Sequence, residues 1–321
     1  MGSIRYGRVD SPRRYNDFNS FLRRTFGCRV QKISIDAGFT CPNRDGSIGW
    51  NGCIYCDGRG SGAPSIERRL PVKAQVETGM QRLKERYNAQ KFIAYFQAFT
   101  NTYAPVEVLK KRYDEALQFD NVVGLAIGTR PDCMPEPVIQ LIESYTQRSQ
   151  VWLEYGLQSI HEHTLALINR GHTYANFVDA VRRTKGRDIL ICGHVIIGLP
   201  GESKAEVMET AKAVASLELD AIKIHSLYVV EGTPLAKLYR QGKGTPLWYT
   251  LDLDEYVERV CNFLEYLPPQ MIIQRLVGEG SRDTLVAPLW TLEKRAVLEA
   301  IDRELERRDS YQGKRYVERE T

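Results

Sequence analysis

The chain has 321 residues, of which 43% are hydrophobic, and this length and composition suit one large α/β domain or two smaller ones. No apolar run approaches the roughly 18 residues of a transmembrane helix, and residues 1–10 lack the apolar core of a signal peptide, so we expect a cytoplasmic protein without a membrane partner. The net charge of +4 is too small to require or exclude an acidic partner.

Residues 1–31 are expected to form a basic N-terminal extension that contains a helix. Basic and aromatic side chains are interleaved there, which suits a surface that neutralises phosphates and stacks on unpaired bases. An amphipathic helix that turns Phe18, Leu22 and Phe26 inward explains the same pattern. Both readings stay open, and the candidate RNA contacts are Arg13, Arg14, Arg23 and Arg24.

The most informative stretch follows a strand-like run at residues 33–35. Three of the seven cysteines, Cys41, Cys53 and Cys56, lie there in a loop rich in Gly, Pro, Asn and Asp. Soft thiolate ligands select zinc, copper(I) or iron–sulfur clusters, and a closed four-ligand site would need a residue that this loop lacks. The count of three therefore indicates an incompletely ligated centre, with a structural zinc site as the alternative. We expect the other cysteines to be small buried hydrophobic residues: Cys28, Cys133, Cys192 and Cys261.

Strand and helix patterns then alternate, giving six strand-then-helix units that predict a parallel sheet with right-handed crossovers. The pattern does not distinguish an open doubly wound sheet from a curved partial barrel. In either architecture, chemistry gathers at the carboxyl ends of the strands, where the cysteine loop also lies. After the first strand, helices are predicted near 72–87, 106–117, 138–145, 177–181 and 207–217, and strands at 92–96, 122–127, 151–157, 189–197 and 221–228.

The alternation stops after Pro234. Helices near 253–267, a strand-like run at 271–277 and a charged helix through 298–305 follow, and we interpret them as a C-terminal α/β extension. The predicted organisation is thus an N-terminal extension at 1–31, a core at 32–235 and an extension at 236–321.

The cysteine loop resembles the signature of the radical S-adenosylmethionine (SAM) superfamily, with Tyr55 as the aromatic residue before the last cysteine. Eleven residues separate the first two cysteines where the superfamily usually has three, and this long spacer is similar to the Elongator-like, YhcC/YtqA-type branch. Further motifs in the expected order support the resemblance over residues 13–316; they lie at 36–46, 128–132, 154–159, 169–173, 194–202, 223–227, 232–235 and 287–290.

The resemblance implies a partial (βα)6 TIM-like barrel and a [4Fe–4S] cluster on Cys41, Cys53 and Cys56. The fourth iron of the cluster would bind SAM, which is cleaved reductively to a 5′-deoxyadenosyl radical.

Five further residues are candidate SAM contacts by this resemblance. Tyr55 would lie near the adenine, and Gln158 with Arg170 resembles a SAM-contacting pair of oxygen-independent coproporphyrinogen oxidases. His194 stands where those relatives carry a ribose-binding Asp. Gln97, with Thr100, would replace the missing segment that binds the SAM amino group.

Each of these assignments has a structural alternative. Gln158 and Arg170 could be a hydrogen-bonded pair that closes the rim, Glu154 an interior strand residue, and Arg130 a turn residue in a surface ion pair. His172 and His225 are equally explained as framework histidines. No catalytic residue is assigned.

The leading functional hypothesis is a radical SAM enzyme of tRNA wobble-uridine side-chain modification, with tRNA and a flavodoxin- or ferredoxin-type electron donor as partners. Two alternatives are a radical SAM enzyme acting on a small metabolite or tetrapyrrole, and a non-catalytic iron–sulfur protein for electron transfer or redox sensing. Three ligands argue against electron transfer, where four cysteines are usual.

Overall fold

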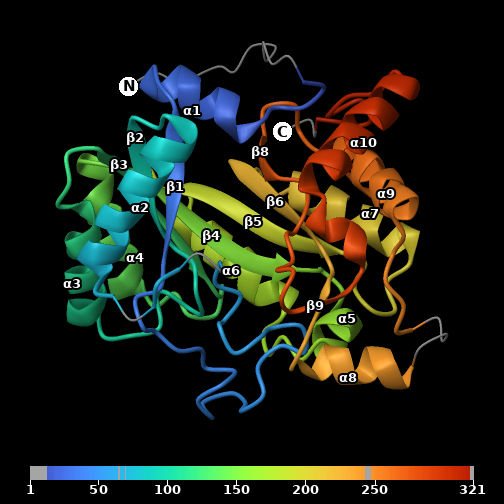
Figure 1. The fold of residues 1–321 in the computed structure, drawn as a ribbon, viewed down its shortest axis with the longest axis horizontal. Helices are drawn as coiled ribbons and strands as arrows, with labels where there is room; N and C mark the ends of the chain where they lie inside the picture. The colour runs from blue at the N-terminus through green and yellow to red at the C-terminus, as the bar shows by residue number, and fades with distance from the viewer. Residues whose placement is uncertain (1–12, 64–65, 69, 243–246, 319–321) are drawn as a thin grey trace.

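The computed structural model describes residues 13–63, 66–68, 70–242 and 247–318. Its centre is a parallel sheet of seven strands in the order β1-β2-β3-β4-β5-β6-β8, curled into a half-barrel with helices on its outer face (Figure 1). This confirms the predicted α/β partial barrel and settles the choice against an open doubly wound sheet. The strands are β1 (Val30–Ile35), β2 (Lys91–Phe96), β3 (Val122–Thr129), β4 (Gln150–Gln158), β5 (Leu190–Ile197), β6 (Ala221–Ser226) and β8 (Ile272–Arg275).

The helices follow the strands as the alternating pattern predicts. Those of the barrel layer are α2 (Val72–Tyr87), α3 (Val106–Leu117), α4 (Glu136–Ser144), α5 (Glu162–Leu167), α6 (Tyr174–Thr184) and α7 (Lys204–Ala215). Beyond β6 come the two-residue strand β7 (Val229–Val230), α8 (Pro234–Gln241), α9 (Leu253–Tyr266), β9 (Leu285–Ala287), which pairs with β7, and α10 (Lys294–Arg307). Among the described residues, no helix is both long and apolar enough to cross a membrane.

The seventh strand is the run at 271–277 that the sequence placed in the C-terminal extension. It pairs in parallel with β6, with Ala221 opposite Ile272, and so widens the half-barrel by one strand. The pattern missed this partnership because β8 follows two helices and an irregular stretch, whereas the other strands follow one crossover each.

Alternation along the strands separates the apolar layer from the barrel interior. On β4, Leu153 and Tyr155 pack against the outer helices, while Glu154 and Gln158 face inward. On β5 and β6 the same alternation turns His194 and Lys223 inward. The main core therefore lies between the sheet and its helices, while the interior is polar toward the carboxyl ends of the strands and is filled at the amino end by a second apolar cluster around Trp152.

The N-terminal helix α1 (Phe18–Phe26) closes the amino end of the half-barrel. Asp17 caps it by accepting the Ser20 amide, and Phe18 and Phe21 lie edge-on to Trp152 at ring distances of 5.6 and 5.9 Å. Next to it, the Ile273 amide of β8 donates to the Asn16 carbonyl at 2.8 Å. The amphipathic interpretation is thus confirmed for Phe18, Leu22 and Phe26, which pack toward the barrel, while residues 1–12 of the basic extension lie outside the described residues.

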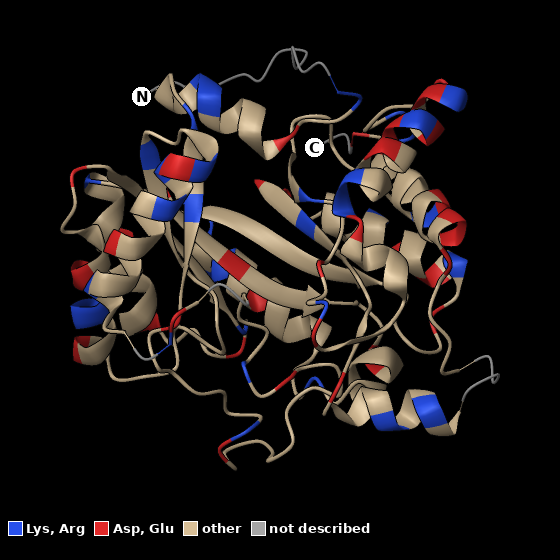
Figure 2. Cartoon of the chain, viewed as in Figure 1, with Lys and Arg blue, Asp and Glu red and all other residues tan. Residues whose placement is uncertain are grey.

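Helix α1 and the cysteine loop lie at opposite ends of the molecule (Figure 1). Charged residues of both signs are spread over the outer helices, and α1 carries basic positions on its outward side (Figure 2). The basic helix therefore stands apart from the carboxyl ends of the strands.

Candidate active site

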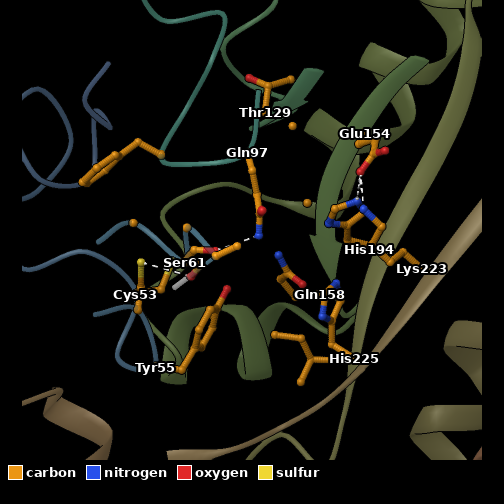
Figure 3. A pocket seen from close by; sticks show the side chains of 18 of the residues that line it. Cys53, Tyr55, Ser61, Gln97, Thr129, Glu154, Gln158, His194, Lys223 and His225 are labelled. Atoms are coloured by element: carbon orange, nitrogen blue, oxygen red, sulfur yellow. Dashed lines mark hydrogen bonds and ion pairs between the residues drawn. The ribbon is translucent and has the colours of Figure 1, made fainter. Parts of the chain in front are cut away.

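A cavity of about 620 Å³ occupies the barrel interior. Figure 3 shows Cys53 and Tyr55 on one side of it, Glu154, His194 and Lys223 on the other, and the amides of Gln97 and Gln158 between them. All eight cluster and SAM candidates from the sequence line this one cavity: Cys41, Cys53, Tyr55, Cys56, Gln97, Gln158, Arg170 and His194. The other four cysteines do not line it.

The cysteine loop is held by the segment that follows α5. The Ile54 amide donates to the Ile168 carbonyl at 3.0 Å, and the Asn169 side chain donates to the Gly52 carbonyl at 2.7 Å. Gly52 has a φ of +68°, and a Cβ there would stand 2.7 Å from the Arg44 Nε atom, so only glycine fits. The loop is therefore a fixed part of the cavity wall.

The Arg170 guanidinium controls the electrostatics of Cys53. Its Nη1 donates to the Cys53 Sγ at 3.5 Å and its Nη2 donates to the Gly156 carbonyl at 2.7 Å. Burial raises the pKa of Cys53, but the charge and hydrogen bond of Arg170 outweigh burial and hold this pKa below its ordinary value. A stabilised thiolate is the form that binds a metal. Burial, and then the charge of Cys53, raise the pKa of Cys56.

The spacing of the three thiols does not suit a single zinc ion. Tetrahedral zinc with Zn–S bonds of about 2.3 Å brings its sulfurs to about 4 Å from one another. The sulfurs of Cys41, Cys53 and Cys56 do not all lie within 4.8 Å of one another. Three thiols spread around one cavity fit a multi-iron cluster better.

The cavity also offers polar atoms that a ligand could satisfy. Within the described residues, four of the residues that line it have a buried side-chain atom without a hydrogen-bond partner: Thr100 Oγ1, Arg170 Nε, Ser226 Oγ and Gln274 Nε2. Buried polar groups are normally paired, so this concentration marks a binding site for a polar molecule.

Gln158 has an unusual backbone conformation. Its φ is +77°, and the β4–β5 register shifts between Gly156 and Gln158. Such an irregularity redirects a side chain at the end of a strand, and strained residues cluster at functional sites. Gly156 leaves room for Arg170, because a Cβ at this position would stand 2.6 Å from the guanidinium. Arg170 bonds to Cys53 and Gly156, and within the described residues no hydrogen bond joins it to Gln158.

Four charged or titratable side chains contact one another deep in the barrel, and the sequence analysis did not predict this network. Glu154 is fully buried and forms ion pairs with Lys32 and Lys223, while the His194 Nε2 lies 2.9 Å from its Oε2. Lys32 also donates to the Gln274 Oε1 at 2.7 Å. Polar residues inside otherwise apolar strands were the available signal, but their partners lie on different strands.

The pKa values in this network follow from burial and charge. Burial raises the pKa of Glu154, but Lys223 and Lys32 outweigh burial and hold it well below its usual range. Burial, with the charge of Lys223, lowers the pKa of His194 to about 4, so this imidazole is neutral at pH 7. Burial lowers the pKa of Lys223 to about 8. His194 is thus anchored by Glu154 on the cavity wall.

Of the other candidates, Arg130 and His172 make framework contacts, whereas His225 lines the cavity. Arg130 is buried, pairs with Asp132 at 2.8 Å and donates to the Arg170 carbonyl at 2.7 Å, so it braces the cluster side of the cavity and is not on the surface. His172 Nε2 lies 3.0 Å from the Gly156 carbonyl oxygen. His225 faces His194, with 5.4 Å between the ring centroids.

The four arginines proposed to contact RNA lie far from the cysteines. Arg14 pairs with Asp309 at 3.2 Å, and Arg13 lies 3.9 Å from Asp302. Arg23 and Arg24 are exposed on α1, at the amino end of the half-barrel. The side chains of Arg13 and Arg14 are also 41% and 37% exposed, so Arg23 and Arg24 differ from them in lying on the helix itself.

Family comparisons cover most of the chain. The model of the "Radical SAM superfamily" matches residues 45–214, and that of the "Radical_SAM C-terminal domain" matches residues 219–307. The chain is 44% identical to the protein YtqA of Bacillus subtilis (strain 168) over 305 residues. This aligned region covers 95% of this chain and 94% of that protein.

Two further similarities are more distant. The chain is 30% identical over 128 residues to the "tRNA uridine(34) acetyltransferase" of Methanocaldococcus infernus, covering 39% of this chain and 23% of that protein. The solved structure of the archaeal Methanocaldococcus infernus Elp3 superimposes with a TM-score of 0.61 at 18% identity, over 88% of this chain and 64% of that chain. At that identity the superposition shows a shared fold.

Proposed function

Because the chain belongs to the radical SAM superfamily and, within it, to the YhcC/YtqA-type family, we propose that it is the radical SAM enzyme of a tRNA wobble-uridine side-chain modification. As a superfamily member it binds a [4Fe–4S] cluster and SAM. The observation that carries the proposal is that three thiols line one cavity in the barrel interior, together with four residues that each hold an unpartnered buried polar atom.

The residues on the two sides of the cavity would have different roles. Cys41, Cys53 and Cys56 would hold the cluster, which together with SAM supplies a 5′-deoxyadenosyl radical that abstracts hydrogen. Arg170 lowers the pKa of Cys53 and so favours its thiolate form. Gln97 is steadied by donating to the Ser61 carbonyl at 3.1 Å, and it stands with Gln158 between the thiols and the Glu154 network.

The tRNA part of the proposal rests on the partial similarity to tRNA uridine(34) acetyltransferases and on the exposed basic residues of α1. The shared segment is 128 residues long, so the similarity does not include the whole of that enzyme. The remaining partner is an electron donor of flavodoxin or ferredoxin type, which the reducing cytoplasm would supply.

The test begins with the anaerobically reconstituted protein, dithionite and SAM. We expect release of 5′-deoxyadenosine, and a cluster-loaded protein that releases none would point to a non-catalytic iron–sulfur protein. Nucleosides of tRNA from a strain that lacks the gene are then compared with the parent by mass spectrometry. A changed wobble uridine supports the proposal. Unchanged tRNA, together with active SAM cleavage, would shift the substrate to a small metabolite or tetrapyrrole.

A further inference from the structure

Two histidines and two glutamates meet on the outer side of the half-barrel, away from the cavity. His161 is the N-cap residue of α5 and His163 lies in its first turn, while Glu206 and Glu209 lie three residues apart on α7. The two helices follow the neighbouring strands β4 and β5. The His-x-His spacing was visible in the sequence, but its carboxylate partners lie more than 40 residues away in the chain.

The ligand atoms in this cluster are close enough to share one ion. His163 Nε2 lies 3.2 Å from Glu206 Oε1, and His161 Nε2 lies 3.0 Å from the backbone carbonyl oxygen of Glu206 and 3.6 Å from Glu209 Oε2. His161, His163 and Glu206 each offer one atom that could bind a metal, and these three atoms all lie within 4.8 Å of one another. The His161 side chain is 14% exposed and that of His163 is 59% exposed, so an ion could enter from solvent.

The Glu206 carboxylate is already oriented. Its Oε2 accepts hydrogen bonds from the backbone amide and hydroxyl of Ser203, at 2.8 and 2.7 Å, in the capping box of α7. This leaves Oε1 directed toward His163. On the other side, the His161 amide donates to the Ser159 hydroxyl at 3.1 Å, which fixes the start of α5. Hydrogen bonds that orient ligands in this way accompany metal sites.

We propose that His161, His163 and Glu206 bind a divalent transition-metal ion of the zinc class, with Glu209 or water completing the coordination. Imidazole nitrogens and a carboxylate oxygen are ligands for such ions, and the set contains no thiol, so it is distinct from the cysteine site.

The position of the site suggests a structural role for the ion. Helix α5 lies in the chain between Gln158, which lines the cavity, and Arg170, which donates a hydrogen bond to Cys53. A bound ion would link the start of α5 to α7 and so stabilise the segment that carries both residues. This inference does not depend on the proposed function.

Zinc is the probe, added to the anaerobically reconstituted holoenzyme, in which the cluster occupies the three thiols. Bound zinc is counted by equilibrium dialysis with metal analysis, and its ligands are identified by X-ray absorption at the zinc edge. We expect one tightly bound ion with only nitrogen and oxygen neighbours, at about 2.0–2.2 Å. His163→Gln and Glu206→Gln should each weaken binding at least tenfold, while Glu218→Gln, an exposed carboxylate just beyond α7, should bind as the unaltered protein does.

Three results would overturn the proposal. One is no zinc retained by the holoenzyme, which would leave the contacts as ordinary histidine–glutamate hydrogen bonds. Another is a sulfur neighbour at about 2.3 Å, which would assign the zinc to cysteines. The third is equal affinity in His163→Gln and the unaltered protein, provided that both carry the same amount of cluster.

Discussion

At the residue scale, Arg170 links the cluster side of the cavity to the barrel wall. It donates to the Cys53 sulfur and to the Gly156 carbonyl, and its Nε has no partner in the part of the chain that the structure describes. Hydrogen bonds to cysteine sulfurs and nearby charge set the potential of an iron–sulfur cluster. We therefore expect Arg170→Gln to shift the cluster midpoint potential to a more negative value, because a positive charge that favours the reduced form is lost. A redox titration followed by electron paramagnetic resonance measures this shift, and an unchanged potential would contradict it.

The cysteines allow a matched pair of substitutions. Cys53→Ala should abolish the brown cluster absorbance while leaving the circular dichroism spectrum of the α/β fold intact. Cys133 is also buried but does not line the cavity, and Cys133→Ala should keep the cluster. Loss of the cluster in both variants would show that the ligand assignment is incomplete.

His194 predicts a specific pH dependence of stability. The unfolded chain binds a proton at this residue below about pH 6.5, but the folded chain does so only near pH 4. Unfolding therefore takes up a proton in this range, and stability falls as the pH falls, by up to about 1.4 kcal/mol per pH unit.

His194→Gln keeps a donor toward Glu154 without a titrating group, so its stability should depend less steeply on pH between 6.5 and 4. Urea unfolding of the cluster-free chain measures the slope. Gln118→Asn, an exposed position at the end of α3 that carries no titrating group, is the control and should keep the original slope. Equal slopes in all three proteins would contradict the prediction.

At the scale of elements, α1 combines a packed face and an exposed basic face. Phe21 is buried against Trp152, so Phe21→Ala should lower the free energy of unfolding by about 3–5 kcal/mol. Thermal or urea unfolding measures the loss. A change under 1 kcal/mol would mean that α1 does not pack on the barrel in solution.

Substitutions on the outer face of α1 test whether this helix contacts RNA. Arg23→Gln with Arg24→Gln should weaken tRNA binding and flatten its salt dependence, because each phosphate contact contributes to the slope. Arg295→Gln, on an equally exposed face of α10, should leave binding unchanged. If the double variant binds tRNA normally, RNA contacts lie elsewhere.

At the scale of the whole molecule, the predicted C-terminal extension completes the barrel. It supplies β8, and its last residues reach the N-terminal segment, where the Asn16 amide donates to Gln312 at 2.9 Å. A chain that ends at Gln241 would expose the edge of β6 and the apolar side of α7, and unpaired edges promote aggregation. We expect this chain to be insoluble, whereas one ending at Tyr316 should fold. A soluble, cluster-binding shorter chain would contradict this prediction.

The sequence alone determined the features that depend on local pattern. Alternating runs gave six of the seven strands, and the spacing of Cys41, Cys53 and Cys56 indicated an incompletely ligated centre. The resemblance of the motifs placed eight candidate residues on what proved to be one cavity. These features can be predicted because strand periodicity and ligand spacing depend only on residues that are close together in the sequence.

Only the tertiary structure decided which distant residues meet. It paired β8 with β6, turned the aromatic residues of α1 onto Trp152, placed the basic helix opposite the cysteine loop, and joined Glu154 to Lys32, Lys223 and His194. Strand partnership and ion pairing across strands depend on how the sheet curls, and no short-range pattern encodes that curvature. The pairing of His161 and His163 with Glu206 has the same origin, because two crossovers bring α5 and α7 together.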